Sequence, residues 1–262
     1  MFQFSEIKEP TEIPAFPSGL SFFDPYLEYH AKEVLAVGGE VQIAKSSEKI
    51  VGLFLYDCYE KTGSIYTRSQ EVFDYFRKLK PSSFVFAEID KDESDREVFD
   101  IYTLNLESKL DHVFKYEVSS PKLEEIEPFV LRTHPNLNPL WVRVALNNGD
   151  KCFVVRFDGK CVGCAWVSSA NGVGRLHTLY VNRQYRRIGI GEDLLFARLL
   201  WLKLKGNRLA FSEISGTNVA SSKVAVKARM LPCGHVYMYH NWVAKPAQTE
   251  AAEEHHSARY TD

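Results

Sequence analysis

An internal repeat runs through this sequence and limits the folds that are open to it. When the chain is aligned with itself at an offset of 111 residues, seven identities fall in step, among them Gly52 with Gly163 and Gly63 with Gly174. In each copy a short turn leads into an apolar run that is typical of a β-strand. Such self-similarity indicates that one supersecondary unit occurs twice. The fold must therefore accommodate two related units.

The two copies differ in length after Thr67. Beyond that residue the segment 78–80 matches the segment 203–205, and the offset has risen from 111 to 125 residues. The second copy therefore contains 14 additional residues, which follow Thr178 and span 179–192. This stretch is rich in glycine and arginine together. One copy is thus expected to carry a loop that the other lacks.

Composition limits the class of protein. The chain has 262 residues, of which 45% are hydrophobic, and its 32 Lys and Arg nearly balance 34 Asp and Glu. These values are typical of a globular protein with one large or two modest domains. A net charge of −2 argues against nucleic acid as the main partner. The apolar stretch 194–204 is interrupted by charges and is too short to cross a bilayer, so no membrane association is expected.

The cysteines indicate a reducing compartment. Five cysteines are an odd number, and the acidic N-terminus does not have the pattern of a secretory signal. We therefore expect free thiols and a cytoplasmic location. Cys161 and Cys164 lie in an apolar run, and no second cysteine pair stands at zinc-site spacing. Buried structural thiols are expected here, and no metal.

Hydrophobic periodicity predicts the elements of the second copy. The predicted strands are 114–118, 152–157, 162–168, 175–181, 208–214 and 235–244. The predicted helices are 123–133, 140–147, 192–205 and 220–230. The helix 192–205 is apolar on nearly every side, so we expect it to be buried against the sheet. Residues 246–262 have few apolar side chains and are expected to be disordered.

The glycine- and arginine-rich segment has the properties of an anion site. Residues 186–192 stand between a predicted strand and the apolar helix, where backbone amides and the positive end of a helix favour negative charge. Gly189 and Gly191 have no Cβ atoms to keep a phosphate from the backbone. The segment is not a dinucleotide-binding fingerprint, because Leu194 stands where the third glycine would be.

At these residues the sequence resembles the GNAT superfamily of acyl-CoA N-acyltransferases. Arg186-x-x-Gly189-x-Gly191 matches the family signature. In that signature Arg or Gln is followed, after two residues of any type, by Gly, and after one further residue by Gly or Ala. Asn218 and Ser221 resemble the family's next helix start. The resemblance implies acetyl-CoA as co-substrate. The residues that it assigns to the acetyl-CoA site are Leu179, Tyr180, Val181, Arg186, Arg187, Ile188, Gly189, Ile190, Gly191, Glu192, Asn218 and Ser221.

The resemblance also implies a fold. We expect an α/β (α+β) protein with two GNAT-like domains in tandem, each a mixed, mainly antiparallel central sheet flanked by helices. Residues 116–245 are expected to form a GNAT acetyltransferase domain. Residues 1–115 are expected to form a degenerate GNAT-like domain that lacks the pyrophosphate loop. One acetyl-CoA site per chain follows from this arrangement.

Two departures from the family pattern bear on the mechanism. Ala225 stands where the family often has a tyrosine that acts as the acid, and the frequent glutamate on the strand before the loop is absent. Strand alternation places Arg175, His177 and Leu179 on one face of that strand. His177 is the first candidate for the general base, because an imidazole pKa of about 6.5 suits proton transfer near neutral pH.

Glu213 is the second candidate for the base. Each candidate has a structural alternative. For His177 the alternative is that the side chain packs or forms hydrogen bonds without a catalytic role. Tyr66 occupies its place in the first copy. Glu88 occupies the place of Glu213, which favours a shared structural role for the two carboxylates.

The predicted activity is transfer of an acetyl group from acetyl-CoA to a primary amine, by direct attack of the amine in a ternary complex. The acceptor is a small molecule or a peptide, which the sequence does not specify. Two alternatives keep the fold: a CoA-binding regulatory module with weak catalysis, and a tandem-GNAT aminoacyl or peptidyl transferase. Slow turnover with amines despite tight CoA binding favours the first alternative. The oligomeric state stays open.

Overall fold

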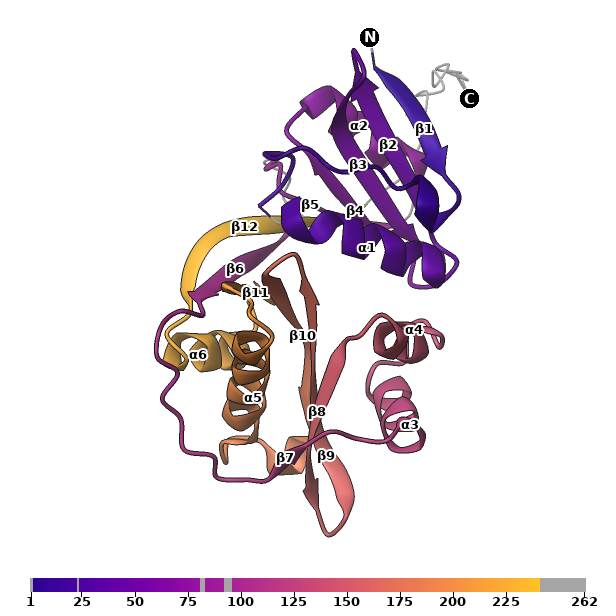
Figure 1. Ribbon diagram of the computed structural model, residues 1–262. Coiled ribbons are helices and arrows are strands. Elements are labelled where there is room, and N and C mark those ends of the chain that lie inside the picture. The colour runs from indigo at the N-terminus through magenta and orange to yellow at the C-terminus, as the bar shows by residue number, and fades with distance from the viewer. Residues whose placement is uncertain (1, 23, 81–82, 92–95, 241–262) are drawn as a thin grey trace, which may run out of the picture.

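The computed structural model describes residues 2–22, 24–80, 83–91 and 96–240 and shows two α/β halves along one continuous sheet (Figure 1). The N-terminal half comprises β1 (Gln3–Ile7), the 3-10 helix η1 (Pro10–Glu12), α1 (Asp24–Ala36), β2 (Glu40–Ser46), β3 (Lys49–Asp57), β4 (Thr62–Thr67), α2 (Gln70–Leu79) and β5 (Phe84–Ala87). The predicted tail, residues 246–262, lies outside the described residues.

The C-terminal half comprises β7 (Val118–Ser119), α3 (Leu123–Thr133), α4 (Trp141–Asn147), β8 (Lys151–Phe157), β9 (Lys160–Ala170), β10 (Val173–Val181), the 3-10 helix η2 (Arg183–Tyr185), α5 (Ile190–Leu204), β11 (Leu209–Ser215) and α6 (Val219–Lys227). Two further strands, β6 (Glu97–Asn105) and β12 (Leu231–His240), lie between the halves.

The two middle strands are exchanged between the halves. The sheet order is β1-β2-β3-β4-β5-β12-β6-β11-β10-β9-β8-β7. β12 pairs antiparallel with β5 of the N-terminal half, whereas β6 pairs antiparallel with β11 of the C-terminal half. The two exchanged strands also pair with each other. The predicted fold class is therefore confirmed, with the two sheets merged into one; the domain boundaries drawn from the sequence stay a prediction.

Both halves repeat the same local architecture. Each contains one parallel pair, β4 with β5 and β10 with β11, among antiparallel neighbours. Gly52 on β3 lies under α2, where an added Cβ would be 2.5 Å from Val72 Cγ1. Gly163 on β9 lies under α5, where an added Cβ would be 3.2 Å from Ile190 Cγ2. These glycines allow each helix to pack closely on its sheet.

Most of the elements predicted for the second copy are confirmed. α3 has the predicted bounds, and α4, β8, β9, β10, α5 and β11 begin and end within two residues of theirs. α6 ends at Lys227 rather than at residue 230, because Arg229 has a φ of 61° and the left-handed backbone stops the helix. β12 begins four residues before its predicted start. Residues 241–244 of its predicted span lie outside the described residues.

The strand predicted for residues 114–118 is wrong for most of its length. β7 contains only Val118 and Ser119. The backbone amides of Lys115 and Tyr116 instead donate to Asp193 Oδ2 at 3.0 and 2.9 Å. The carboxylate of α5 therefore takes the hydrogen bonds that a strand would have used.

Helices cover both faces of the sheet in each half. In the C-terminal half α5 and α6 lie on one face and α3 and α4 on the other (Figure 1). The predicted burial of α5 is confirmed, with Leu194, Leu199 and Leu202 inaccessible to solvent. α1 packs against β2 and β3 of its own half and also contacts β9 and α4 of the other. This placement brings side chains of the N-terminal half against the C-terminal sheet.

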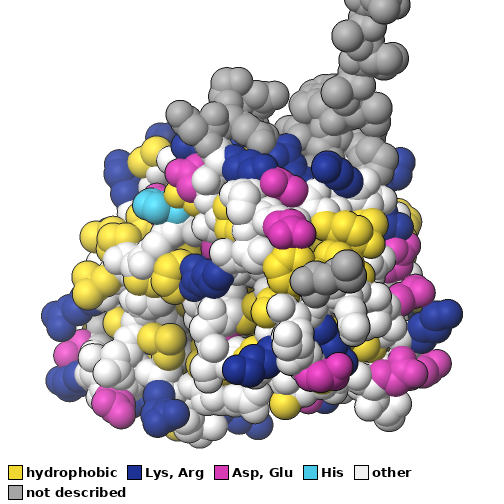
Figure 2. Space-filling model, turned by 90° about the horizontal axis from the view of Figure 1, so that it is seen from above, with side chains coloured by type: hydrophobic (Ala, Val, Ile, Leu, Met, Phe, Trp, Pro, Cys, Tyr) yellow, Lys and Arg dark blue, Asp and Glu magenta, His cyan; other side chains and the backbone are white. Residues whose placement is uncertain are grey.

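Charge is distributed over the surface without a single-sign field on the face that Figure 2 shows, where basic and acidic side chains are interspersed. Among the described residues, no helix is both long enough and apolar enough to span a membrane.

Candidate active site

The parallel strands β10 and β11 separate along their length. Their hydrogen-bonded register runs only from Val173 with Leu209 to Arg175 with Phe211. Each strand then continues without the other among the described residues, β10 to Val181 and β11 to Ser215. The gap opens into a cavity of about 560 Å³ that residues of both halves line. A ligand can therefore lie between two strand edges.

A bulge in β10 reorients the side chains that border this gap. The register with β9 shifts between His177 and Tyr180, and Thr178 has a φ of 49°. Leu179 consequently packs on the α5 side of the sheet, whereas Tyr180 packs against Phe129 of α3. The predicted alternation is therefore wrong at Leu179, which does not share the face of His177.

The segment before α5 presents open backbone amides. α5 begins at Ile190, and its N-cap is Gly189 with a φ of 109° and no capping side chain. Within the described residues, no acceptor is bonded to the amides of residues 187–191. Arg186 Nε donates to the Val181 carbonyl at 2.8 Å and so spans the loop. Unsatisfied amides at a positive helix end, next to Arg187, form a site that fits a pyrophosphate.

Asp193 and its hydrogen-bond partners hold the segment before α5 in place. Its side chain is 1% exposed and accepts hydrogen bonds from His112 Nε2 at 2.7 Å as well as from the amides of Lys115 and Tyr116. The Tyr116 hydroxyl donates in turn to the Ile188 carbonyl at 3.2 Å. The chain that enters the C-terminal half is thereby tied to the first turn of α5.

α6 borders the same gap. The Asn218 side chain caps α6 by accepting from the Ser221 amide at 3.2 Å, and both residues line the cavity. Lys227 at the end of α6 forms an ion pair of 3.0 Å with Glu192 in the first turn of α5. Ala225, which replaces the family's tyrosine, is buried at 2% exposure. The helix thus contributes to the gap without supplying an acid.

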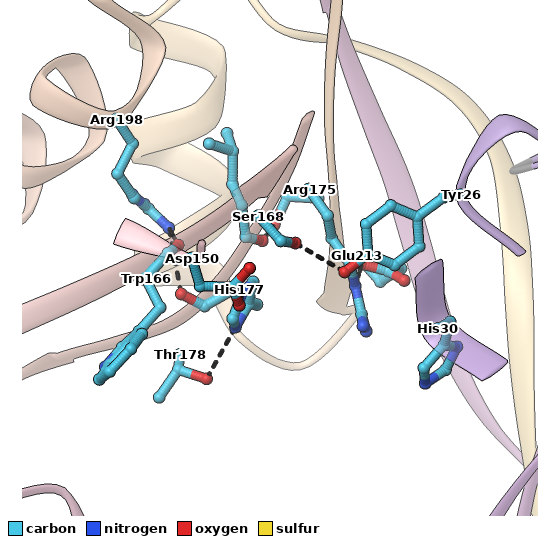
Figure 3. Close-up of polar contacts among 12 residues, drawn as sticks. Tyr26, His30, Asp150, Trp166, Ser168, Arg175, His177, Thr178, Arg198 and Glu213 are labelled. Carbon is cyan, nitrogen blue, oxygen red and sulfur yellow. Dashed lines mark hydrogen bonds and ion pairs between the residues drawn. The ribbon is translucent and has the colours of Figure 1, made fainter. Parts of the chain in front are cut away.

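His177 lies inside the molecule beside a carboxylate. Its Nδ1 is 3.3 Å from Thr178 Oγ1, and its Nε2 is 3.6 Å from Asp150 Oδ2 (Figure 3). Neither Nε2 nor Oδ2 has a hydrogen-bond partner in the part of the chain that the structure describes. Burial, followed by the charge of Arg175, lowers the pKa of His177 to about 3. The imidazole is therefore neutral at pH 7.

Asp150 is the functional candidate that sequence reasoning missed. Its side chain is 1% exposed, and burial raises its pKa to about 7, against the opposing effect of the hydrogen bond that Tyr29 donates to Oδ1. A carboxylate with such a pKa exchanges protons at neutral pH. A sequence signal for Asp150 did exist. At the offset of 111 residues the first copy has Gly39 at the corresponding position, so the carboxylate is present only in the second copy.

Glu213 forms an ion pair with a half-buried arginine. Arg175 Nε lies 3.2 Å from Glu213 Oε2, and both side chains appear together in Figure 3. The repeat partner Glu88 is likewise 3.3 Å from Arg68 and accepts a hydrogen bond from the Phe22 amide at 3.0 Å. Both carboxylates line the cavity.

The N-terminal half supplies one wall of the cavity. Tyr26, His30 and Glu33 on one side of α1 all line it. The Tyr26 hydroxyl is 2.6 Å from Ser168 Oγ on β9, and His30 Nδ1 is 2.9 Å from the Tyr66 hydroxyl. Burial lowers the pKa of His30 to about 3. These residues could not be connected to the site from the sequence, since the contact joins positions more than 100 residues apart.

The separating strands β10 and β11 and the open N-terminus of α5 lie within a segment that matches a known family. Residues 113–228 match the model of the acetyltransferase (GNAT) family. The match covers less than half of the chain, so it is this segment that is similar to the family. No curated protein matches the sequence significantly.

Solved structures share the whole two-half architecture. A tandem GNAT protein from the clavulanic acid biosynthesis pathway superposes with a TM-score of 0.63 at 14% identity, over 94% of this chain and 100% of its own. A GCN5-related N-acetyltransferase from Sphaerobacter thermophilus gives 0.60 at 13% identity, over 92% and 96%. A GNAT-family acetyltransferase from Colwellia psychrerythraea gives 0.55 at 12% identity, over 91% and 99%. At these identities the likeness shows the fold, which is that of a tandem GNAT protein.

Proposed function

We propose that this protein transfers an acetyl group from acetyl-CoA to a primary amine, by direct attack of the amine within a ternary complex. The observation that carries the proposal is the row of open amides at residues 187–191 beside the gap between β10 and β11. Phosphates bind at such helix ends. Residues of β10 and β11 that border the gap also line the cavity, where an amine has room to meet the thioester.

The acetyl-CoA site is supported by the residues around the gap. The amides of residues 187–191, with Arg186 and Arg187, would hold the pyrophosphate. Asn218 and Ser221 border the path of the pantetheine arm on the α6 side, and the backbone of 179–181 borders it on the β10 side. Backbone amides in that stretch would stabilise the oxyanion of the tetrahedral intermediate.

The proton of the attacking amine needs an acceptor with a suitable pKa. An alkylammonium has a pKa of about 10.4, so transfer to an imidazole of pKa about 3 costs about 10 kcal/mol, and transfer to a carboxylate of pKa about 7 costs about 4.6 kcal/mol. We therefore assign the final proton to Asp150. His177 lies between the cavity and Asp150 and relays the proton. Its Nδ1 accepts the proton of the amine while its Nε2 donates the ring proton to Asp150 Oδ2. Glu213 is the alternative acceptor.

The departing thiolate needs no protein acid. A thiol of pKa about 8.5 leaves as the thiolate at pH 7 at a cost of about 2 kcal/mol. The absence of a tyrosine at Ala225 is therefore compatible with turnover.

Calorimetric titration of acetyl-CoA tests the proposal. The wild type is expected to bind one acetyl-CoA per chain. Gly189→Glu should weaken binding by at least about a hundredfold, because it places a carboxylate at the open amides and an unfavourable side chain at a φ of 109°. Gly159→Glu is the matched control, since it also replaces a left-handed glycine, of φ 73°, but in a turn where nothing lies within 4 Å.

An amine panel with acetyl-CoA then separates catalysis from binding. Acetylated product from any primary amine supports the transferase. Two acetyl-CoA per chain, or equal binding by the Gly189→Glu variant, contradicts the site. Tight binding with no acetylated product from any amine contradicts the transferase and favours a CoA-binding regulatory module.

A further inference from the structure

The cavity wall that the N-terminal half contributes carries three carboxylates for which the described residues supply no ion-pair partner. Glu33 lies on α1, Asp57 ends β3, and Glu60 follows in the next turn, and all three line the cavity. Among the described residues, no Lys, Arg or His lies within ion-pair distance of them. The two other carboxylates of the cavity differ in this respect, because Glu88 and Glu213 each have an arginine partner.

Neutral donors hold these three carboxylates in place. Glu33 Oε1 accepts from the Trp141 indole at 3.2 Å. Asp57 Oδ1 accepts from the amides of Tyr59 and Glu60 at 2.8 Å. Glu60 Oε1 is 3.4 Å from the Asn138 amide. These bonds orient the carboxylates but add no positive charge, and Arg175 acts on Glu33 only from beyond ion-pair distance.

Their environment favours a positive ligand. Burial raises the pKa of Glu33 and of Glu60, and the neighbouring carboxylates Asp150 and Asp57 raise them further. A cation within reach of Glu33 and Glu60 would remove this repulsion and would need no new charge from the protein.

A separate observation points to a ligand in the same region. His177 lines the same cavity, and within the described residues neither its Nε2 nor the facing Oδ2 of Asp150, whose side chain is 1% exposed, has a hydrogen-bond partner. Contacts through His177 and Trp141 connect Asp150 with the acidic wall. The His177 ring lies 5.7 Å from the Trp141 ring, and Trp141 in turn donates to Glu33. Because His177 lines the same cavity of about 560 Å³ as Glu33, Asp57 and Glu60, one small molecule can lie against both the acidic wall and His177.

We infer that the acceptor is a small diamine, in which one amine is acetylated near His177 and a second, charged ammonium is bound by Glu33, Asp57 and Glu60. The inference rests on the proposed function for the fate of the first amine. The N-terminal half, which lacks its own pyrophosphate loop, thereby acts as the acceptor-recognition half. Such an arrangement selects substrates by charge at a fixed distance from the reacting nitrogen.

A matched pair of ligands tests this site on the full chain. 1,5-Diaminopentane and pentylamine have the same carbon chain and differ in the second ammonium. The wild type is expected to bind the diamine at least tenfold more tightly in calorimetry without acetyl-CoA, and to acetylate it with at least tenfold higher kcat/KM. Glu33→Gln keeps the acceptor for Trp141 and removes the charge, so the preference should vanish. Glu28→Gln is the control, because Glu28 lies on the same helix, 44% exposed and paired with Lys32.

The outcomes separate this inference from the proposed function. Equal binding of the two amines by the wild type overturns the inference, whether or not either is acetylated. Another outcome is that the wild type prefers the diamine, that Glu33→Gln loses this preference, and that no acetylated product forms. That result supports the acidic site and contradicts only the proposed transferase activity. Glu60→Gln is measured in parallel. If thermal unfolding shows that the Glu33 variant is misfolded, the diamine preference of the Glu60 variant still tests the site. A preference that survives in both folded variants overturns the assignment of these carboxylates.

Discussion

The two halves share their strands and differ at the start of one helix. In the N-terminal half α2 follows β4 after two residues, and the Ser69 side chain accepts from the Val72 amide at 3.4 Å. In the C-terminal half α5 follows β10 after eight residues, and Gly189 offers no capping side chain. The first helix satisfies part of its own N-terminus, whereas the second leaves its amides open. A capped end serves stability, and an open end is available to an anion.

A second difference concerns the proton-transfer groups. At the offset of 111 residues, Asp150 and His177 correspond to Gly39 and Tyr66. A Cβ at Gly39 would lie 2.5 Å from the Tyr56 carbonyl oxygen, so no acidic side chain fits there. The halves therefore have the same sheet architecture and different chemistry, and the N-terminal half contributes a wall to the site of the other.

Stability as a function of pH gives the largest expected effect. The raised pKa of Asp150 favours its protonated form in the folded state, so this stabilisation is complete below pH 4 and is lost as pH rises through about 7. At pH 8 the buried carboxylate costs up to about 4 kcal/mol. Asp150→Asn keeps an acceptor for Tyr29 and should be more stable than the wild type at pH 8, with a difference that shrinks toward pH 5. Urea unfolding at both pH values measures it, and a constant difference contradicts the assignment.

Catalysis provides the next effect. Asp150→Asn should lower kcat by about a hundredfold, the usual range for loss of a general base. In the wild type kcat/KM should rise with pH through about 7, because Asp150 must be ionised to accept a proton. The variant should lose that inflection. Tyr29→Phe should move it upward, since the lost hydrogen bond had lowered the carboxyl pKa. An inflection that stays in place in both variants would assign the proton to another group.

Helix packing gives the smallest effect and compares the halves directly. Gly52→Ala should destabilise the protein by about 2–3 kcal/mol, because the new Cβ would be 2.5 Å from Val72 Cγ1. Gly163→Ala should cost about 1 kcal/mol, since its nearest contacts are at 3.2 Å. Denaturant unfolding of both variants measures the difference. A reversed order would mean that α5, not α2, is the more tightly seated helix.

Much of the fold followed from the sequence because its determinants are local. The repeat identified the two units, and periodicity placed α3 with its observed bounds. The alternation of side chains along a strand did not predict the bulge at Thr178. A single residue with a φ of 49° changes the face of the side chains after it.

The rest of the site depends on distant contacts. The loop at 186–191 was recognised because amides, glycines and arginines act together in one segment. Asp150 and Tyr29 meet across 121 positions, and only the folded chain brings α1 onto β9. The exchange of β6 and β12 is equally a property of the whole sheet.

The exchanged strands also govern when each half can be finished during synthesis. β5 ends at Ala87, but its neighbour β12 begins only at Leu231, so the N-terminal sheet waits with an unpaired edge for more than half the chain. β6 in turn has no partner until β11 has been made. Neither half therefore completes its hydrogen bonding before the other, and the two should gain their final stability in a single cooperative step of high contact order.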